Sequence, residues 1–367
     1  MKRIRYGRIA AIVTAGALAL TACGNDPAAD TGDGGGGDTG AASDLAGTLA
    51  GAGATSQESA QNAWAAKFME ANPDVDLSYD PVGSGGGRTA FLEGGVAFAG
   101  SDSALTDDER TKAKTRCDGG DAYDLPLYIS PIAVVFNLKD VKDLNLAPAT
   151  IAKIFDRKIA KWNDPAIAAD NPDASLPDLA ITPVNRSDES GTTKNFTDYL
   201  SKTAAADWPH ESSGDWPLQG GQSAQGTSGV VQAVQGADGT IAYADHSQAG
   251  SLGVAKIKVG EKFVAPTAEG AAKVVEESPR TEGVPEHDIA IDLKRDTTTD
   301  GAYPLVLVSY IIACSKYGDA EQSKLVKAYL TYLASADGQG VAAKEAGSAP
   351  ISDALRTDVE ASVKSIA

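Results

Sequence analysis

The sequence predicts an α/β protein in which helices cover both faces of the sheets. Segments typical of strands alternate with segments typical of helices along most of the chain, which is the pattern of layered α/β folds. Tyr128–Leu138 is a continuous apolar run, typical of a buried strand. Beyond the N-terminal region about 320 residues remain, more than one small core normally holds, so we expect two domains.

The predicted elements follow this alternation in order. A helix over Ala60–Glu70 precedes the alternating strand Val75–Val82, a glycine turn and a helical stretch at Thr89–Leu92. Later strands are expected at Leu179–Val184, Thr240–Tyr243 and Tyr303–Cys314, and later helices near Ser190–Leu200 and over Ala320–Ala334 and Ser352–Ile366. No internal repeat and no heptad run interrupts the pattern.

The first 22 residues are typical of a signal peptide. Four basic residues precede the apolar run Ile9–Leu20, which is too short to span a bilayer because a spanning helix needs about 20 apolar residues. The run ends in Leu20-Thr21-Ala22-Cys23, which resembles the lipobox of bacterial lipoproteins. The resemblance implies that residues 1–22 are removed and that Cys23 carries acyl chains, which anchor the protein to the membrane. The alternative is a plain cleavage site with an incidental cysteine.

Residues 23–47 are expected to form a disordered tether. From Gly24 to Gly47 the chain consists mainly of Gly, Asp, Ala and Thr, and it has too little apolar surface to offset the entropy of ordering. As a flexible coil this segment would reach about 27 Å.

The charge argues against one class of function. The chain has a formal net charge of −18, and removal of the four basic residues of the signal peptide lowers it to −22. Nucleic-acid binders present basic surfaces, so no nucleic-acid partner is expected. The same charge repels anions at long range, so any selection of an anion must come from a local, buried site.

Three segments rich in Gly, Ser and Thr stand where a helix is expected to begin. They are Gly51–Ser56, Gly83–Gly87 and Arg186–Thr192. A helix N-terminus has unpaired N–H groups and a partial positive charge, glycine lets an anion approach the backbone, and hydroxyls add donors. Each segment alone is also what an ordinary helix-capping turn looks like. Together they indicate a site for an oxyanion.

Other chemistries lack the residues that they need. The sequence contains no nucleotide-binding phosphate loop and no Gly-x-Ser-x-Gly nucleophile elbow. The histidines His210, His246 and His287 are isolated and do not have metal-ligand spacing, and paired carboxylates such as Asp107-Asp108 are typical of solvated helix faces. We therefore expect no catalytic residues, no metal and no cofactor.

The three segments, together with three other segments of the chain, resemble the phosphate-binding protein of the bacterial phosphate-specific ABC transporter. The resemblance runs from about Thr48 to the C-terminus and includes Gly51–Thr55, Val82–Gly87, Phe98–Leu105, Lys158–Asp164, Arg186–Thr192 and Gly239–Tyr243. It implies a two-lobed periplasmic-binding-protein fold of type II, with two hinge-strand crossings. By analogy, residues 48–128 and 302–367 form lobe one and residues 129–301 form lobe two.

The resemblance also implies a function, partners and ligands. It implies a monomeric binding protein, outside the cell membrane, that captures inorganic phosphate and delivers it to the permease of an ABC importer. Asp102 is expected to accept a hydrogen bond from phosphate, Arg186 to pair with two of its oxygens, and Asp188 to hold the guanidinium in place. The remaining expected ligands are Thr55, Ser56 (through its N–H), Ser84, Ser190, Gly191 and Thr192.

Two positions depart from the family pattern. Ser56-Gln57 stands where many relatives have Phe-Pro, and because the backbone is expected to bind there, binding should survive. Glu189 replaces a glycine common in relatives and is expected to point to solvent, away from the anion. Arg88, which follows the glycines of the second segment, is expected to point outward along its helix.

Two further expectations use these assignments. With Cys23 assigned to lipid, Cys117 and Cys314 are the remaining pair, both in the predicted lobe one, and a disulfide between them is expected; two buried free thiols are the alternative. Thr106 and Glu109 form a capping-box pattern, which leaves Asp102 free for the ligand. Sulfate binding and a secreted phosphatase activity are the alternatives to phosphate transport.

Overall fold

The computed structural model describes residues 44–367, and its fold is α/β as predicted. The predicted signal peptide, Cys23 and most of the predicted tether lie outside the described residues. Gly47, the last residue of the predicted tether, is already the first residue of strand β1. Among the described residues, no helix has the length and apolar character needed to cross a membrane.

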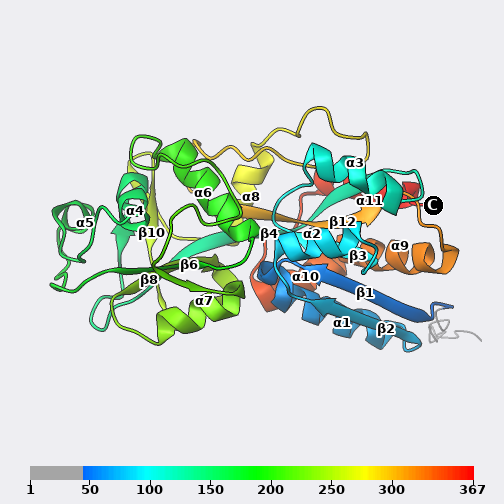
Figure 1. Ribbon diagram of the computed structural model, residues 1–367, viewed down its shortest axis with the longest axis horizontal. Helices are drawn as coiled ribbons and strands as arrows, with labels where there is room; N and C mark the ends of the chain where they lie inside the picture. The colour runs from blue at the N-terminus through cyan, green and yellow to red at the C-terminus, as the bar shows by residue number, and fades with distance from the viewer. Residues whose placement is uncertain (1–43) are drawn as a thin grey trace, which may run out of the picture. The chain divides into compact units, whose positions relative to one another are not determined.

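One sheet of nine strands runs through the structure (Figure 1), and what we call its first half contains strands of mixed direction. Strand β1 (Gly47–Gly53) pairs in parallel with β2 (Val75–Asp80) and β3 (Phe98–Ser101). Strand β12 (Val306–Cys314) runs antiparallel to β3 and to residues 122–131 of β4. Figure 1 shows α2 and α3 on one side of these strands and α1 and α10 on the other.

Strand β4 (Ala122–Asn137) belongs to both halves of the sheet. Its residues up to Pro131 pair with β12, and its residues from Ile132 onward pair with β8 (Thr240–Asp245). The second half of the sheet therefore consists of residues 132–137 together with β8, β6 (Thr182–Arg186), β7 (Gln222–Ala224) and β9 (Gly253–Val254). The change of partner falls three residues beyond Tyr128, the end of the first stretch predicted for lobe one.

Helices cover both halves of the sheet. The helices around the first half are α1 (Glu58–Ala71), α2 (Ser84–Leu92), α3 (Asp107–Arg116), α9 (Ala320–Ala334), α10 (Ala336–Ala346) and α11 (Asp353–Ser365). The remaining helices are α4 (Pro148–Phe155), α5 (Pro165–Asp170), α6 (Gly191–Thr203), α7 (Gly226–Gln235) and α8 (Ala268–Glu276), with short 3-10 helices η1 (Thr55–Gln57) and η2 (His246–Gln248). A small sheet joins β5 (Asn145–Leu146), β10 (Lys256–Val259) and β11 (Lys262–Val264).

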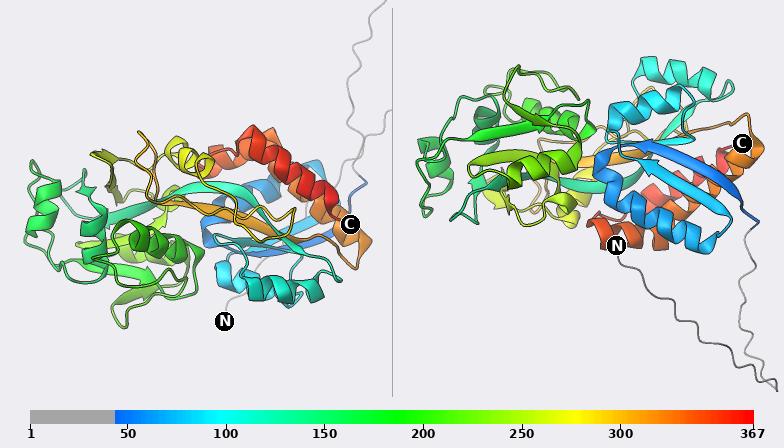
Figure 2. Two further views of the ribbon diagram at one scale, coloured as in Figure 1. Left: turned by 90° about the horizontal axis from the view of Figure 1, so that it is seen from above. Right: turned by 60° about the horizontal axis from the view of Figure 1, so that its bottom comes forward.

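Part of the segment predicted for lobe two lies against the first half of the sheet. Ile289 N donates to Asp124 O at 3.0 Å, and Ile291 N donates to the Tyr310 hydroxyl at 3.0 Å. The left view of Figure 2 shows this connection (yellow to orange) alongside the strands β4 and β12. The predicted lobe boundaries remain predictions, but the return of the chain begins before residue 302.

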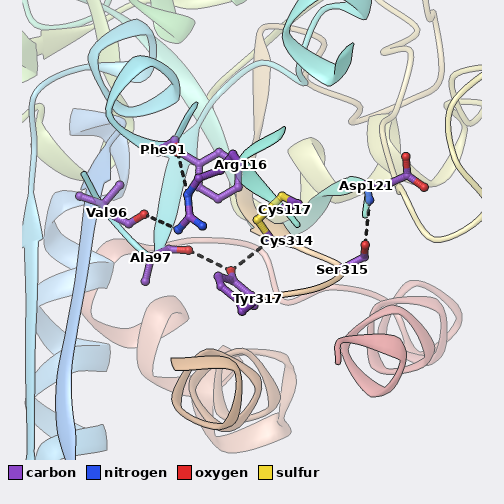
Figure 3. The surroundings of a disulfide bond; sticks show 9 residues. All are labelled: Phe91, Val96, Ala97, Arg116, Cys117, Asp121, Cys314, Ser315 and Tyr317. Carbon is purple, nitrogen blue, oxygen red and sulfur yellow. Dashed lines mark hydrogen bonds between the residues drawn. A yellow bond between two sulfur atoms is a disulfide. The ribbon is translucent and has the colours of Figure 1, made fainter. Parts of the chain in front are cut away.

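The expected disulfide is present between Cys117, which follows α3, and Cys314, which ends β12 (Figure 3). Both residues are fully buried. The Tyr317 hydroxyl beside them accepts from Cys314 N at 3.0 Å and donates to Ala97 O at 2.9 Å. The bond joins residues 197 apart in sequence and so fastens α3 to β12 within the first half of the sheet.

Candidate functional site

The three Gly/Ser/Thr segments stand at the starts of helices, as predicted. Thr55 begins η1 directly after β1, and Ser84 begins α2. Ser190 is the N-cap of α6, and its hydroxyl accepts from Thr193 N at 3.2 Å. Each segment therefore supplies N–H groups that the first turn of a helix leaves free.

Asp102 brings two of these segments together. It follows β3, and its backbone N–H donates to Ser84 Oγ at 3.1 Å. Its Oδ2 accepts from Thr192 Oγ1 at 3.0 Å, and Asn195 Nδ2 donates to its carbonyl oxygen at 2.7 Å. Asp102 thus joins the first half of the sheet to helix α6, which follows the second half.

Glycine is required where the segments meet. A Cβ atom on Gly191 would lie 2.5 Å from Ser84 Oγ and 2.5 Å from the Asp102 Cβ, which no side chain tolerates. Gly83 has a φ of +90°, and a Cβ there would lie 2.7 Å from Asp188 Oδ2. These glycines let the backbones approach closely enough for one small ligand to contact both sides.

Arg186 is buried at the end of β6 and is paired with Asp188, as predicted. Arg186 Nε donates to Asp188 Oδ1 at 2.8 Å, and Nη2 donates to Oδ2. Burial raises the pKa of Asp188, but the Arg186 guanidinium and the Gly226 N–H outweigh burial and hold the pKa below its usual value. Nη1 of Arg186 makes no hydrogen bond within the part of the chain that the structure describes, so its donors are available to a ligand.

A fourth helix N-terminus, not predicted from the sequence, completes the site. Gly226 and Thr227 begin α7. Thr227 Oγ1 lies 2.8 Å from Thr55 Oγ1, and Gly226 N donates to Asp188 Oδ1 at 3.1 Å. The sequence carried a signal for it, because Gln225–Gly229 is the same kind of Gly/Ser/Thr segment.

The carboxylate of Asp102 is surrounded by hydroxyl donors. Ser56 Oγ donates to Oδ1 at 2.5 Å, so its side chain binds Asp102, whereas the prediction for Ser56 concerned only its backbone N–H as a donor to phosphate. Ser309 Oγ, from β12, also donates to Oδ1 at 2.6 Å. Burial is the largest influence and raises the pKa of Asp102, while the bonds from Ser309, Ser56 and Thr192 oppose it.

Arg88 does not point outward, so that expectation is wrong. Its residue surface is 8% exposed, and all three guanidinium nitrogens donate hydrogen bonds. Nε binds Glu109 Oε1 at 2.8 Å, and Nη1 binds the hydroxyls of Ser101 and Ser103, each at 3.1 Å. Arg88 lies inward because these acceptors compensate its charge in the interior.

The expectation that Glu189 points to solvent is also wrong. Its Oε1 accepts from Arg88 Nη2 at 3.1 Å, and its side chain is 29% exposed. Gly85 and Gly214 make room for it, because a Cβ on either would lie 2.1 Å from a carboxylate oxygen. Glu189 turns inward because Arg88 offers it a positive partner, which also limits its repulsion of a neighbouring anion.

The capping prediction is confirmed, and His210 is paired outside the three segments. Thr106 caps α3 and forms a capping box with Glu109, whereas Asp102 caps no helix. Among residues 44–367 no three His, Cys, Asp or Glu side chains are grouped to hold a metal ion. His210 pairs with Asp156 at 2.8 Å. The arrangement can therefore hold an anion with N–H, hydroxyl and guanidinium donors facing one acidic acceptor.

Comparison with known proteins gives a consistent result. Residues 38–337 match the family of PBP superfamily domains. Phosphate-binding protein PstS3 of Mycobacterium bovis is 37% identical over 382 residues, and PstS2 of the same strain is 34% identical over 380 residues; both comparisons cover 100% of each chain. A crystal structure of a high affinity periplasmic phosphate-binding protein bound with phosphate covers 86% of this chain and 93% of its own, with a TM-score of 0.69 and 21% identity. The predicted periplasmic-binding-protein fold is confirmed.

Proposed function

Since this chain belongs to the PstS phosphate-binding proteins of the PBP superfamily, we propose that it captures inorganic phosphate between two lobes and delivers it to an ABC phosphate importer. The relatives carry the name of phosphate-binding proteins, and the described residues place the donors of four helix starts around one buried arginine and one buried carboxylate. The proposed activity is binding without catalysis.

The proposal depends most on one observation, which is that buried Arg186 has hydrogen-bond donors on Nη1 that no described residue uses. A buried guanidinium normally uses its donors within the protein, yet here Asp188 takes only Nε and Nη2. The unused Nη1 donors suit the oxygens of a tetrahedral anion, and Asp188 fixes the plane in which they point. We assign the ligand set to Thr55, Ser56, Ser84, Asp102, Arg186, Ser190, Gly191 and Thr192, and add Thr227 as a residue beside it.

Capture depends on contacts between the two lobes. Thr55 and Ser84 follow strands of the first half of the sheet, while Arg186 ends strand β6 of the second half and Gly191 follows it, so an anion held by both groups favours the closed form. Each hydrogen bond to the charged ligand contributes roughly 1.5–3 kcal/mol once water is excluded. The two crossings at β4 and before β12 are the proposed hinges.

The proposed location is the outer face of the cell membrane. After removal of residues 1–22, acylated Cys23 would hold the protein at the membrane, and the residues up to the start of β1 would let it reach the permease. The protein is proposed to act as a monomer, because its ligand donors come from one chain.

Isothermal titration of the delipidated protein with phosphate, sulfate and arsenate tests the proposal. We expect one phosphate to bind per chain, arsenate to bind with the same stoichiometry, and sulfate not to bind. Hydrolysis of a chromogenic phosphate ester, measured with and without zinc, is the control for a phosphatase. Turnover of the ester, or absence of phosphate binding by folded protein, would contradict the proposal.

A further inference from the structure

A chain of buried polar side chains leads from the core to Asp102. Tyr329 OH donates to Gln61 Oε1 at 2.8 Å, and Gln61 Nε2 donates to Gln57 Oε1 at 2.8 Å. Gln57 Nε2 donates to Ser309 Oγ at 2.6 Å, and Ser309 Oγ donates to Asp102 Oδ1 at 2.6 Å. All five side chains are buried. We call this series the Asp102 relay.

The direction of the relay follows from one backbone contact. Gln57 Nε2 also donates to the Tyr310 carbonyl oxygen at 3.1 Å. A carbonyl oxygen only accepts hydrogen bonds, so the nitrogen end of the amide must face β12. Because Ser309 Oγ accepts from this amide, its single proton is directed to Asp102.

The relay favours the ionised form of Asp102. Oδ1 accepts hydrogen bonds from both Ser309 and Ser56, so a proton of its own on that oxygen would meet two donor hydrogens. Oδ2 accepts from Thr192 and is the oxygen with capacity left for a ligand. An ionised carboxylate cannot donate, so an anion that contacts it must bring its own proton.

We infer that Ser309 and Gln57 are positioning residues that keep Asp102 a hydrogen-bond acceptor and so set the selectivity of the site for protonated over unprotonated tetrahedral anions. This inference rests on the proposed function and deepens it. Ser309 acts through Asp102, and Gln57 acts through Ser309; neither belongs to the proposed ligand set. The departure at Ser56-Gln57 then has a physical role, since both side chains lead to the same carboxylate oxygen.

Other charged and titratable groups surround Asp102. Arg186 on β6 favours its ionised form, while Asp245 at the end of β8 and Tyr79 on β2 interact with its negative charge. Arg110, Lys194, Asp198, Lys202, Asp292, Arg295 and Tyr310 line a neighbouring cavity of about 310 Å³ that Asp102 also lines. Burial raises the pKa of Asp245 to about 7, so this group titrates in the range of interest and needs its own control.

The test is the pH at which sulfate begins to bind. Protonated Asp102 can donate to sulfate, so acidification should admit sulfate to the wild-type protein. In Ser309→Ala the ionised form loses a donor, and we expect the onset to move up by about one pH unit, the size of one hydrogen bond to a charged group. Gln57→Met should shift the onset in the same direction by less. Phosphate affinity at pH 8 should change by less than about fivefold, because the ligand set is intact.

Titrations of sulfate and phosphate between about pH 4.5 and pH 8 provide the measurement. Ser362→Ala is the matched control, because Ser362 is a buried serine that donates to Asp358 O at 3.0 Å, away from the site. The series is repeated in an Asp245→Asn background, where the same shift is expected. Circular dichroism verifies that each variant is folded.

The outcomes separate this inference from the proposed function. If Ser309→Ala and Gln57→Met keep the wild-type onset while Asp102→Asn binds sulfate at neutral pH, the relay has no role and the phosphate function stands. If the shift disappears in the Asp245→Asn background, Asp245 and not Asp102 is the group that responds, and the inference is overturned. If folded wild-type protein does not bind phosphate, both fail.

Discussion

Two buried arginines lie close to the site, and they use their donors differently. Arg186 pairs with one carboxylate, Asp188, which lies two residues further along the chain, and keeps Nη1 free. Arg88 donates to two carboxylates and two hydroxyls, and one of these partners, Glu189, lies 101 residues away. Burial and a carboxylate partner are common to both, so neither feature by itself identifies a ligand-binding arginine.

Unused donors therefore distinguish an arginine that can bind a ligand from one that only holds secondary structure together. A guanidinium whose nitrogens are all occupied can hold secondary structure together, but it has little left for an anion. Arg88 therefore holds α2 to α3 and to the loop before α6, whereas Arg186 keeps Nη1 donors for the proposed ligand. The acceptor counterpart of Arg186 is Asp102, whose Oδ2 also retains capacity.

The largest effect is expected from Asp102→Asn, measured as the ratio of phosphate to sulfate affinity. Sites that leave a buried polar group unpaired reject an analogue by about 10⁴–10⁵, and sulfate has no proton for the carboxylate. Asparagine offers N–H donors instead, so the ratio should fall by about a thousandfold or more, mainly through tighter sulfate binding. Titration calorimetry with both anions at neutral pH gives the ratio. Sulfate binding within tenfold of phosphate in the wild type would show that Asp102 is not the discriminator.

The comparison of the arginines itself is tested by Arg186→Ala and Arg88→Ala. Loss of Arg186 removes two hydrogen bonds to a charged ligand in a dry site, so phosphate affinity should fall by about 100-fold or more. Arg88→Ala should reduce affinity by less than about tenfold but lower stability by about 3 kcal/mol, because Glu109 and Glu189 lose their buried partner. Calorimetry and urea unfolding separate the two quantities. Equal losses of phosphate affinity in the two variants would contradict the assignment of ligand binding to Arg186 and of a structural role to Arg88.

Sequence patterns predicted the elements whose structure depends on residues close to them along the chain. Helix α9 has the predicted bounds, Ala320–Ala334, because a cap and a continuous apolar pattern mark it. Strand β4 begins at Ala122, six residues before the predicted start, because Asp124 and Pro126 make that stretch unlike a strand. Asp124 is tolerated there because its carboxylate accepts from Arg110 Nη2 at 2.8 Å and from Leu105 N, which are contacts with a separate part of the chain.

The same limit applies to the site. The positions of Thr55, Ser84 and Ser190 at helix starts could be predicted because a turn rich in Gly, Ser and Thr before a helix is a local signal. Ser309 has none, since it lies inside an apolar strand and acquires its role from Asp102, 207 residues away. The orientation of Arg88 was mispredicted for the same reason, because nothing beside it in the sequence indicates Glu189.

Asp188→Asn tests whether the carboxylate orients Arg186, and its expected effect on phosphate affinity is smaller. The amide can accept only once toward the guanidinium, so Arg186 becomes less well oriented and phosphate affinity should fall by about tenfold. The pair also predicts a pH effect. The pKa of Asp188 is lowered in the folded protein, so its contribution to stability is present above the unfolded pKa of about 4 and is lost as the pH falls through the folded value. Unfolding of wild type and variant should therefore converge at low pH, and a constant difference between pH 7 and pH 2 would contradict the prediction.

The smallest effect is expected from Glu189→Gln, which removes one charge of the bracing network and keeps its volume between Gly85 and Gly214. The Arg88–Glu189 pair joins α2 to the loop before α6, so it stabilises only the closed arrangement of the lobes. Partly exposed ion pairs contribute about 0.2–1 kcal/mol, so phosphate affinity should fall no more than about fivefold, and less at high salt. Glu211→Gln, at an exposed position before the same Gly214, is the matched control and should bind as wild type does. Tighter phosphate binding by Glu189→Gln would mean that repulsion between this carboxylate and the anion outweighs its pairing with Arg88. The role of Arg88 would then be to neutralise Glu189 beside the anion and not to hold α2 to the loop before α6.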